Sequence, residues 1–448
     1  MELRHLSWVL LAVWGCATSG AASNHLGEQE SQSPVAFIDN DQGAALRAAR
    51  EKHLPVFVEA WAPWCHACRA MRATVLNDPA LKPWSSRFIW LAVDTDNPSN
   101  EDFLSRFPVD TWPTLLVLDP ERETLVARSL GAVSVPQLVE FLEQAEHAFR
   151  EGRQEAEAGI TRADALAVSG AHAEAIAAYQ QALSRLPQDG PLRAGAVVSL
   201  LKSLSATDNP DECMRLTARE LPHLSRVGDR ARVLYVGIGC SLDVETEEAA
   251  TLRTRLAEET ARAIAAPAEA LVPDVRSSLY EALIEIRQMS GDEEGTKSLA
   301  EQWLTFIEES AGRARGAEER SAFDTHRMMA AMILEQPERA IPALERSERE
   351  LPTDYNPPAR LSELYLQTGQ LDPALRASDR ALSRVPRATR GTVLASRARI
   401  LLARGERAQA EQMLTAALQE LEGTDGFGTW RQRLVLQRTL NFIRSSGH

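Results

Sequence analysis

The C-terminal part of the chain carries a repeat with fixed internal spacing. Two stretches place the same types of residue at successive intervals of 5, 4, 3, 1 and 4 positions. One spacing that recurs along a chain is typical of stacked helix pairs, in which small alanines let the two helices approach closely. Glycine opens the turn between the helices, and proline ends the second helix. The positions are Gly170, Ala175, Tyr179, Ala182, Leu183 and Pro187 in the first stretch, and Gly369, Ala374, Ser378, Ala381, Leu382 and Pro386 in the second.

The repeat resembles the tetratricopeptide repeat, a helix–turn–helix unit of about 34 residues. Ala340 and Ala374 are 34 residues apart, and Gly405 belongs to a further unit. The aromatic residue that this family places in its first helix is mostly missing, so the middle units are degenerate. The resemblance implies an all-α tetratricopeptide-type helical solenoid of about seven helix pairs over residues 150–448, with a surface for a protein partner.

Residues 34–149 alternate between strand and helix patterns, unlike the rest of the chain. Apolar runs predict four strands, and amphipathic stretches predict four helices. Their order is that of a small α/β domain with a mixed sheet. The predicted strands are Pro55–Trp61, Phe88–Val93, Thr114–Leu118 and Thr124–Leu130, and the predicted helices are Asp39–His53, Cys65–Leu76, Glu101–Phe107 and Pro136–Phe149.

Two cysteines stand at the start of the helix that follows the first predicted strand. Cys65 and Cys68 are three positions apart, a spacing that lets the sulfurs bridge without distortion. The helix N-terminus stabilises a thiolate, so we expect Cys65, at the exposed end, to be the nucleophile and the more buried Cys68 to displace a mixed disulfide. Glu59 lies six residues before Cys65 on an otherwise apolar strand, where a carboxylate costs free energy unless it has a function. We expect Glu59 to relay a proton to or from Cys68.

The segment Trp-Ala-Pro-Trp-Cys-His-Ala-Cys, with its upstream carboxylate, resembles the thioredoxin family. In this family the first cysteine attacks, the second displaces and the buried acid assists. The resemblance also implies that Pro113 is a cis-proline facing the dithiol and that Trp112 offers backbone hydrogen bonds to a substrate. The C-terminal domain of the bacterial thiol:disulfide interchange reductases is more similar still, over about residues 36–148. The predicted catalytic residues are Cys65, Cys68, Glu59 and Pro113, and the predicted substrate-binding residues are Trp64, His66 and Trp112.

The two residues between the cysteines leave the direction of electron flow open. Thioredoxin has Gly-Pro there, whereas this chain has His66 and Ala67. A histidine that donates to the Cys65 thiolate favours the reduced form, but one pKa unit is worth only about 30 mV for a two-electron couple. Reductants and oxidants of this superfamily differ by about 150 mV, so His66 shifts the potential without deciding the class. The alternative for His66 is an exposed residue with no role beyond the turn.

The cysteine pair has two other interpretations, half of a zinc site or a permanent structural disulfide. Four-ligand zinc usually needs a second close pair, and Cys213 and Cys240 are single and distant. We therefore expect no metal site and no cofactor, and we expect His326, a single histidine in a helical stretch, to be a surface or packing residue rather than a ligand. Cys213 and Cys240 are either two buried small residues or a disulfide between adjacent helices, which an oxidising compartment allows.

The first residues of the chain resemble a bacterial export signal. Residues 1–15 combine a short n-region with an apolar run too short to span a membrane as a helix. Cys16 follows in a sequence similar to a lipobox, although Trp14 is bulky where small residues are usual, and plain cleavage near residues 20–22 is the alternative. We expect a lipidated Cys16, a flexible tether over residues 16–33, and a lipid-anchored protein of the bacterial periplasm or cell envelope.

Charge narrows the possible partners. The net charge is −14, whereas nucleic-acid binders usually have a basic face, so we expect no nucleic-acid partner. The expected protein has two domains, an α/β thioredoxin fold over residues 34–149 and the helical solenoid. The expected function is an exported thiol–disulfide oxidoreductase that acts on protein cysteines, uses a redox partner protein and binds a protein through its repeats. The alternative is an interaction scaffold whose thioredoxin-like module docks partners or senses redox state.

Overall fold

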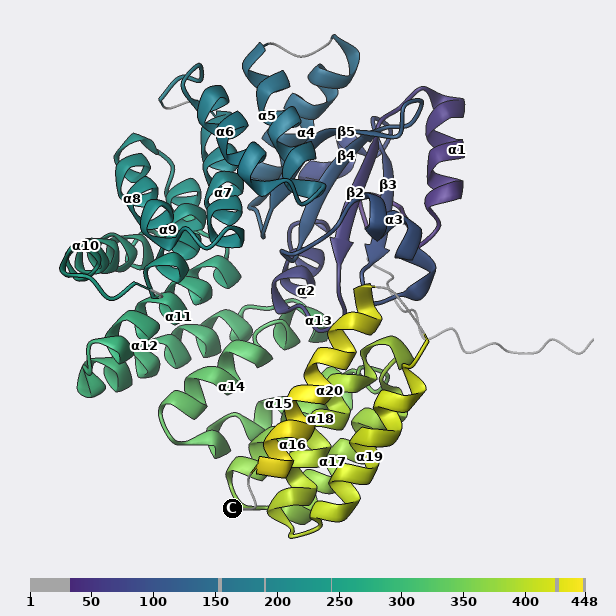
Figure 1. The fold of residues 1–448 in the computed structure, drawn as a ribbon, viewed down its shortest axis with the longest axis vertical. Helices are drawn as coiled ribbons and strands as arrows, with labels where there is room; N and C mark the ends of the chain where they lie inside the picture. The colour runs from purple at the N-terminus through teal and green to yellow at the C-terminus, as the bar shows by residue number, and fades with distance from the viewer. Residues whose placement is uncertain (1–32, 152–154, 189–190, 243, 424–426, 446–448) are drawn as a thin grey trace, which may run out of the picture. The chain divides into compact units, whose positions relative to one another are not determined.

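A five-stranded mixed sheet forms the N-terminal region of the computed structural model, which describes residues 33–151, 155–188, 191–242, 244–423 and 427–445. Its strand order is β1-β3-β2-β4-β5, so β2 is central (Figure 1). β2 pairs in parallel with β3 and antiparallel with β4. The four predicted strands are confirmed, and the three-residue β1 is an additional edge strand too short to have a recognisable pattern. The strands are β1 Phe37–Asp39, β2 Val56–Trp61, β3 Ile89–Asp94, β4 Thr114–Asp119 and β5 Thr124–Leu130.

Two helices pack on each face of this sheet. Phe57 and Trp90 share one hydrophobic cluster with residues of α2 and α4, while Val58 and Leu91 share another with residues of α1 and α3. Successive residues of a strand point to opposite faces, so a strand covered on both faces is apolar along its whole length. These helices are α1 Gln42–Lys52, α2 His66–Ala73, α3 Glu101–Arg106 and α4 Val135–Arg150.

Beyond residue 151, the described residues form helices and loops without a strand, which confirms the predicted all-α region (Figure 1). The helices are α5 Glu155–Val168, α6 His172–Leu183, α7 Pro191–Ala206, α8 Pro210–Glu220, α9 Val227–Leu242, α10 Glu247–Ile264, α11 Pro273–Met289, α12 Glu293–Gly312, α13 Ala317–Ser321, α14 Asp324–Ile333, α15 Ile341–Glu350, α16 Asn356–Gln367, α17 Leu371–Arg384, α18 Arg390–Ala403, α19 Arg407–Glu420 and α20 Phe427–Ser445. Short 3-10 helices in the chain are η1 Pro79–Trp84, η2 Pro98–Asn100, η3 Leu221–His223, η4 Ala268–Ala270, η5 Pro337–Arg339 and η6 Arg387–Thr389.

The predicted helix–turn–helix units are found at the repeated glycines. Gly170, Gly369 and Gly405 have φ values of 80°, 71° and 81°, a left-handed conformation that costs glycine little because it has no Cβ. The alanines five positions later, such as Ala175 and Ala374, are fully buried. Each unit therefore turns at its glycine and packs its helices through small side chains.

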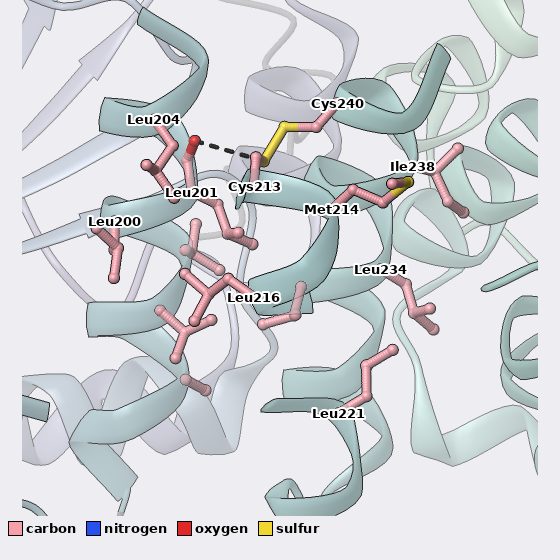
Figure 2. Close-up of a cluster of buried hydrophobic side chains, with 14 of the residues drawn as sticks. Leu200, Leu201, Leu204, Cys213, Met214, Leu216, Leu221, Leu234, Ile238 and Cys240 are labelled. Atoms are coloured by element: carbon pink, nitrogen blue, oxygen red, sulfur yellow. Dashed lines mark hydrogen bonds between the residues drawn. A yellow bond between two sulfur atoms is a disulfide. The ribbon is translucent and has the colours of Figure 1, made fainter. Parts of the chain in front are cut away.

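A disulfide joins α8 and α9 inside the helical region. Cys213 and Cys240 form an S–S bond of 1.98 Å within a hydrophobic cluster that includes Leu201 and Leu216 (Figure 2). Both cysteines are buried. Of the two interpretations that the sequence allows for this pair, the structure has the disulfide.

The first and the last helices of the helical region both contact the sheet domain. α5 and α7 contact β5, α11 and α13 contact α2, and α20 contacts α3. Residues 34–448 form one compact unit. The contacts at α2 matter most, because the two close cysteines lie at the start of that helix.

Within the described ranges, no helix is both long and apolar enough to cross a membrane. The predicted signal peptide over residues 1–15, the lipidation site Cys16 and all but the last residue of the predicted tether lie outside the described residues.

Candidate active site

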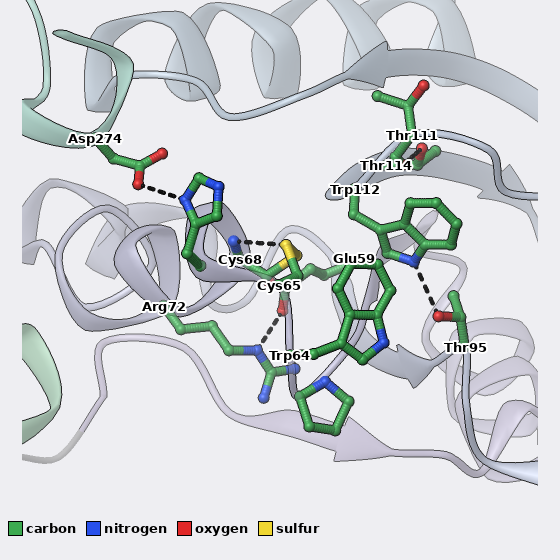
Figure 3. Close-up of a disulfide and its surroundings, with 12 residues drawn as sticks. Glu59, Trp64, Cys65, Cys68, Arg72, Thr95, Thr111, Trp112, Thr114 and Asp274 are labelled. Atoms are coloured by element: carbon green, nitrogen blue, oxygen red, sulfur yellow. Dashed lines mark hydrogen bonds and ion pairs between the residues drawn. A yellow bond between two sulfur atoms is a disulfide. The ribbon is translucent and has the colours of Figure 1, made fainter. Parts of the chain in front are cut away.

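Cys65 and Cys68 form a disulfide at the N-terminus of α2 (Figure 3). Cys65 caps this helix, and its Sγ accepts a hydrogen bond of 3.0 Å from the backbone N–H of Cys68. Backbone N–H groups at a helix N-terminus carry partial positive charge, so these donors stabilise a thiolate at Cys65 once the disulfide opens. The arrangement suits thiol–disulfide exchange with Cys65 as the attacking sulfur.

The prediction that Cys65 lies at an exposed helix end is wrong. Its exposed fraction is 4%, and that of Cys68 is 0%. The helical region covers the start of α2, where the Asn356 side chain donates to the carbonyl of Pro63 at 3.0 Å. This contact joins residues 293 positions apart, a distance over which local sequence patterns carry no information.

Glu59 is fully buried on β2 and pairs with Arg72 of α2. Arg72 Nε donates to Glu59 Oε2 at 2.8 Å, while Oε1 has no hydrogen-bond partner in the described part of the chain (Figure 3). Burial raises the pKa of Glu59 to about 7, although Arg72 opposes part of the rise. Glu59 can therefore take up or release a proton near neutral pH, which its predicted role beside Cys68 requires.

The Trp112–Pro113 peptide bond is cis, as the resemblance to the thioredoxin family implies. Pro113 immediately precedes β4, which pairs with β2, the strand that leads to the cysteines. The rings of Trp112 and Trp64 meet edge-on with 5.1 Å between centroids, and Trp112 Nε1 donates to Thr95 Oγ1 at 2.9 Å (Figure 3). Both tryptophans pack against the hydrophobic cluster that contains the two cysteines.

Arg431 of α20 lies over the same tryptophans. Its guanidinium carbon is 3.9 Å from the ring centroid of Trp64 and 5.4 Å from that of Trp112. Arg431 also pairs at 3.4 Å with buried Asp96, which accepts a hydrogen bond of 2.7 Å from Trp64 Nε1. Burial raises the pKa of Asp96, and Arg431 opposes that rise. Sequence reasoning misses Arg431, because nothing near it in the chain marks it as part of a site.

His66 is paired, which contradicts the alternative that it is an exposed residue without a role. Its Nδ1 lies 3.1 Å from Oδ1 of Asp274 on α11, and Nε2 of His326 on α14 lies 3.1 Å from the same oxygen. Burial alone lowers the pKa of His66, but the Asp274 carboxylate makes the net shift upward. Among the described residues, His66, Asp274 and His326 form the group whose donor atoms are close enough to hold a metal ion, all within 4.8 Å of one another.

Two cavities border this group. One, of about 150 Å³, has His66, Thr111 and Trp112 on one side and Lys202 and Tyr235 of the helical region on another. A second cavity, of about 540 Å³, has a mainly apolar lining. Asp274 contributes to both linings. The smaller cavity has room for a side chain or a short extended segment but not for a folded partner.

Residues 37–120 match the family model described as thioredoxin-like. Thioredoxin 1 of Synechococcus elongatus is 32% identical over 95 residues, which cover 21% of this chain and 82% of that protein. Thiol:disulfide interchange protein DsbD 2 of Pseudomonas aeruginosa is 30% identical over 131 residues, which cover 28% of this chain. The chain spans only 21% of that relative's length.

A tetratricopeptide repeat protein from Parabacteroides merdae aligns over 65% of this chain and 100% of its own, with a TM-score of 0.41 and 17% sequence identity.

Proposed function

Since the chain belongs to the thioredoxin family through its N-terminal domain, we propose that it is a thiol–disulfide oxidoreductase acting on protein cysteines. The observation that carries the proposal is the Cys65–Cys68 disulfide at the start of α2, close to a cis-proline and following a strand with a buried carboxylate. The pair has both parts that exchange needs, a sulfur at a helix N-terminus and a second sulfur within bonding distance.

In the reducing direction, the Cys65 thiolate attacks one sulfur of a substrate disulfide and the other substrate sulfur leaves as a thiolate. Cys68 then loses its proton and attacks Cys65 Sγ, which forms the Cys65–Cys68 disulfide and releases the second substrate thiolate. Glu59, with a pKa of about 7, accepts the Cys68 proton in this step. The oxidising direction is the reverse, with the proton returning to Cys68. Either cycle requires a redox partner protein to restore the starting state.

The helical region has two roles in the proposed function. Its outer surface binds a protein partner, as repeat solenoids generally do. Its contacts at the start of α2 restrict access to Cys65, which is 4% exposed. We infer that substrates reach the sulfur as extended segments beside Trp64 and Trp112. Alternatively, the helical residues over the start of α2, among them Asn356 and Arg431, move away when the partner binds; we call these residues the cover.

Export and membrane anchoring are a separate part of the proposal. Residues 1–15 would direct export to the periplasm or cell envelope, and a lipidated Cys16 would hold the protein at a membrane. Mass spectrometry of the mature N-terminus tests this point. A lipid-modified Cys16 supports the anchor, and an unmodified N-terminus downstream of Cys16 excludes it.

A second function, an interaction scaffold with a redox-sensing module, is favoured by one observation, the burial of the disulfide beneath the helical region. Reduction of insulin by dithiothreitol, with and without the protein, separates the two functions. An oxidoreductase accelerates the reaction, and Cys65→Ser abolishes the acceleration. If the Cys65→Ser variant accelerates insulin reduction as much as the wild-type protein does, catalysis by Cys65 is excluded and the scaffold function is supported.

A further inference from the structure

Three side chains from three helices converge on one point next to the cysteine pair. His66 is the first residue of α2, Asp274 lies in the first turn of α11, and His326 lies in α14. Each imidazole places one nitrogen 3.1 Å from Asp274 Oδ1. We propose that His66 Nδ1, Asp274 Oδ1 and His326 Nε2 bind a divalent transition-metal cation of the zinc class.

The separations between the donor atoms suit such an ion. Zinc binds nitrogen and oxygen ligands at about 2.1 Å, so two ligands of one ion lie about 3.0–3.4 Å apart in octahedral or tetrahedral geometry. Both nitrogen–oxygen distances of 3.1 Å fall within that range. The two nitrogens lie within 4.8 Å of each other, so closing the set around a tetrahedral ion requires a shift of at most about 1.4 Å in one imidazole ring.

The charge around the group favours a cation. Asp274 is buried, and one further carboxylate of the same helix, Glu281, acts on His66. Burial raises the pKa of Glu281 to about 7, although the charge of His66 opposes part of the rise. Arg360 is the opposing positive charge that acts on both histidines. With both histidines neutral, as metal ligation requires, the Asp274 and Glu281 carboxylates outnumber the Arg360 guanidinium, and a divalent ion would stabilise the ionised form of both acids.

The donor set and its surroundings identify the class of ion. Two imidazoles and one carboxylate are typical ligands of zinc sites that keep an open coordination position, while calcium and magnesium prefer oxygen donors alone. Asp274 also lines both cavities, so a route to the site and space for a water ligand are present. His326 is fully buried with its ring against Trp303, which holds the imidazole in place.

A bound ion would connect the two regions at the residue that follows Cys65. His66 belongs to the sheet domain, and the other two ligands belong to the helical region. The ion would therefore strengthen the cover over the cysteine pair. Its positive charge would also lie next to the attacking sulfur, where it would favour the thiolate.

Zinc titration of the full-length protein tests the site. The protein carries Cys16→Ser, is stripped with a chelator and is kept oxidised, so that both disulfides are closed and no free thiol competes for the ion. Isothermal titration with zinc chloride is expected to give one saturable equivalent, and cobalt chloride is expected to give the visible absorption of a site with nitrogen and oxygen ligands. Zinc is also expected to raise the melting temperature, since an ion that binds the folded state stabilises it.

The variants are His66→Ala, Asp274→Asn and His326→Gln, each expected to weaken zinc binding at least tenfold. His53→Ala and His147→Ala are controls at exposed histidines in the sheet domain, and both should bind zinc as the wild type does. His326 is fully buried, so if that variant fails to fold the decision passes to His66→Ala, whose side chain is 28% exposed. Absence of saturable binding by the wild-type protein overturns the proposal. Affinity in the folded variants within threefold of the wild-type value also overturns it, and the three residues are then a hydrogen-bonded group only.

Discussion

The sheet domain and the helical region contribute different things to one site. The sheet domain holds the sulfurs, the buried acid and the cis-proline within residues 59–113. The helical region supplies side chains from far along the chain, among them Asp274, which pairs with His66, and Arg431, which lies over the ring of Trp64. The reacting groups therefore belong to the sheet domain, while the helical region surrounds them and restricts access to Cys65.

Loss of the second sulfur should have the largest effect. In Cys68→Ser, Cys65 can attack a substrate, but no sulfur remains to displace the product, so turnover should fall at least about 10³-fold, as for loss of other covalent catalytic groups. The variant should accumulate a covalent adduct with insulin through Cys65, which peptide mapping under non-reducing conditions detects. Turnover close to the wild-type value would show that the pair does not act by the proposed exchange.

Opening the second disulfide should affect stability rather than chemistry. Cys213 and Cys240 enclose a loop of 27 residues, for which chain entropy gives about 3.5 kcal/mol of stabilisation. The double variant Cys213→Ala/Cys240→Ala should lose about that free energy of unfolding in urea titrations, while the folded protein keeps its insulin reductase activity. Loss of activity in a folded double variant would assign chemistry to the helical region as well.

Glu59 should make stability depend on pH in a defined direction. Its pKa rises from 4.5 in the unfolded chain to about 7 in the folded protein, so its stabilising contribution is fully present below pH 4.5 and is lost as the pH rises through 7. Glu59→Gln has no titrating group at this position and does not lose this contribution. The free energy of unfolding of the variant, relative to that of the wild type, should therefore be about 2 kcal/mol higher at pH 8 than at pH 5. Urea unfolding at the two pH values measures the difference, and the inflection of the pH–rate profile near pH 7 should also disappear. A relative stability of the two proteins that does not change with pH would contradict the assignment.

Removing one contact of the cover should have the smallest effect, and it should raise the reactivity of Cys65 rather than lower an activity or a stability. Arg431→Ala removes the guanidinium that lies over Trp64 and pairs with Asp96. Cys65 in the reduced protein should then react about two- to fivefold faster with iodoacetamide, because Arg431 is one of several covering contacts. Arg438→Ala, at an exposed position on the same helix, is the matched control and should react at the wild-type rate. A slower reaction in Arg431→Ala would mean that this arginine activates the sulfur rather than covers it.

Sequence reasoning recovers the sheet domain well because its signals are local. The strand, the cysteine spacing, Glu59 and the Trp112–Pro113 step all lie within a short segment, and each has a physical meaning by itself. The repeat also predicts the turns at Gly170 and Gly369, since glycine is needed where φ is positive.

The cover over the cysteines could not be predicted in this way. The contact of Asn356 with the loop before Cys65 and that of His326 with Asp274 depend on how the helices stack, which no local pattern encodes. The exposure expected for Cys65 is wrong for this reason, because a helix N-terminus is open only until another part of the chain packs on it. Polar residues such as Asp274 look like ordinary surface residues until the packed structure brings them together.

The reduction potential of the Cys65–Cys68 pair decides whether the pair is redox-active. The protein is equilibrated in glutathione or dithiothreitol buffers of graded potential, its free thiols are alkylated, and the fraction reduced is measured by mass spectrometry of the peptide that carries both cysteines. A redox-active pair should have a midpoint between about −270 and −120 mV, the range from thioredoxins to strong oxidants, and its position in that range gives the direction of electron flow. A midpoint below about −300 mV would make the pair a structural disulfide and would contradict catalysis of thiol–disulfide exchange by Cys65 and Cys68.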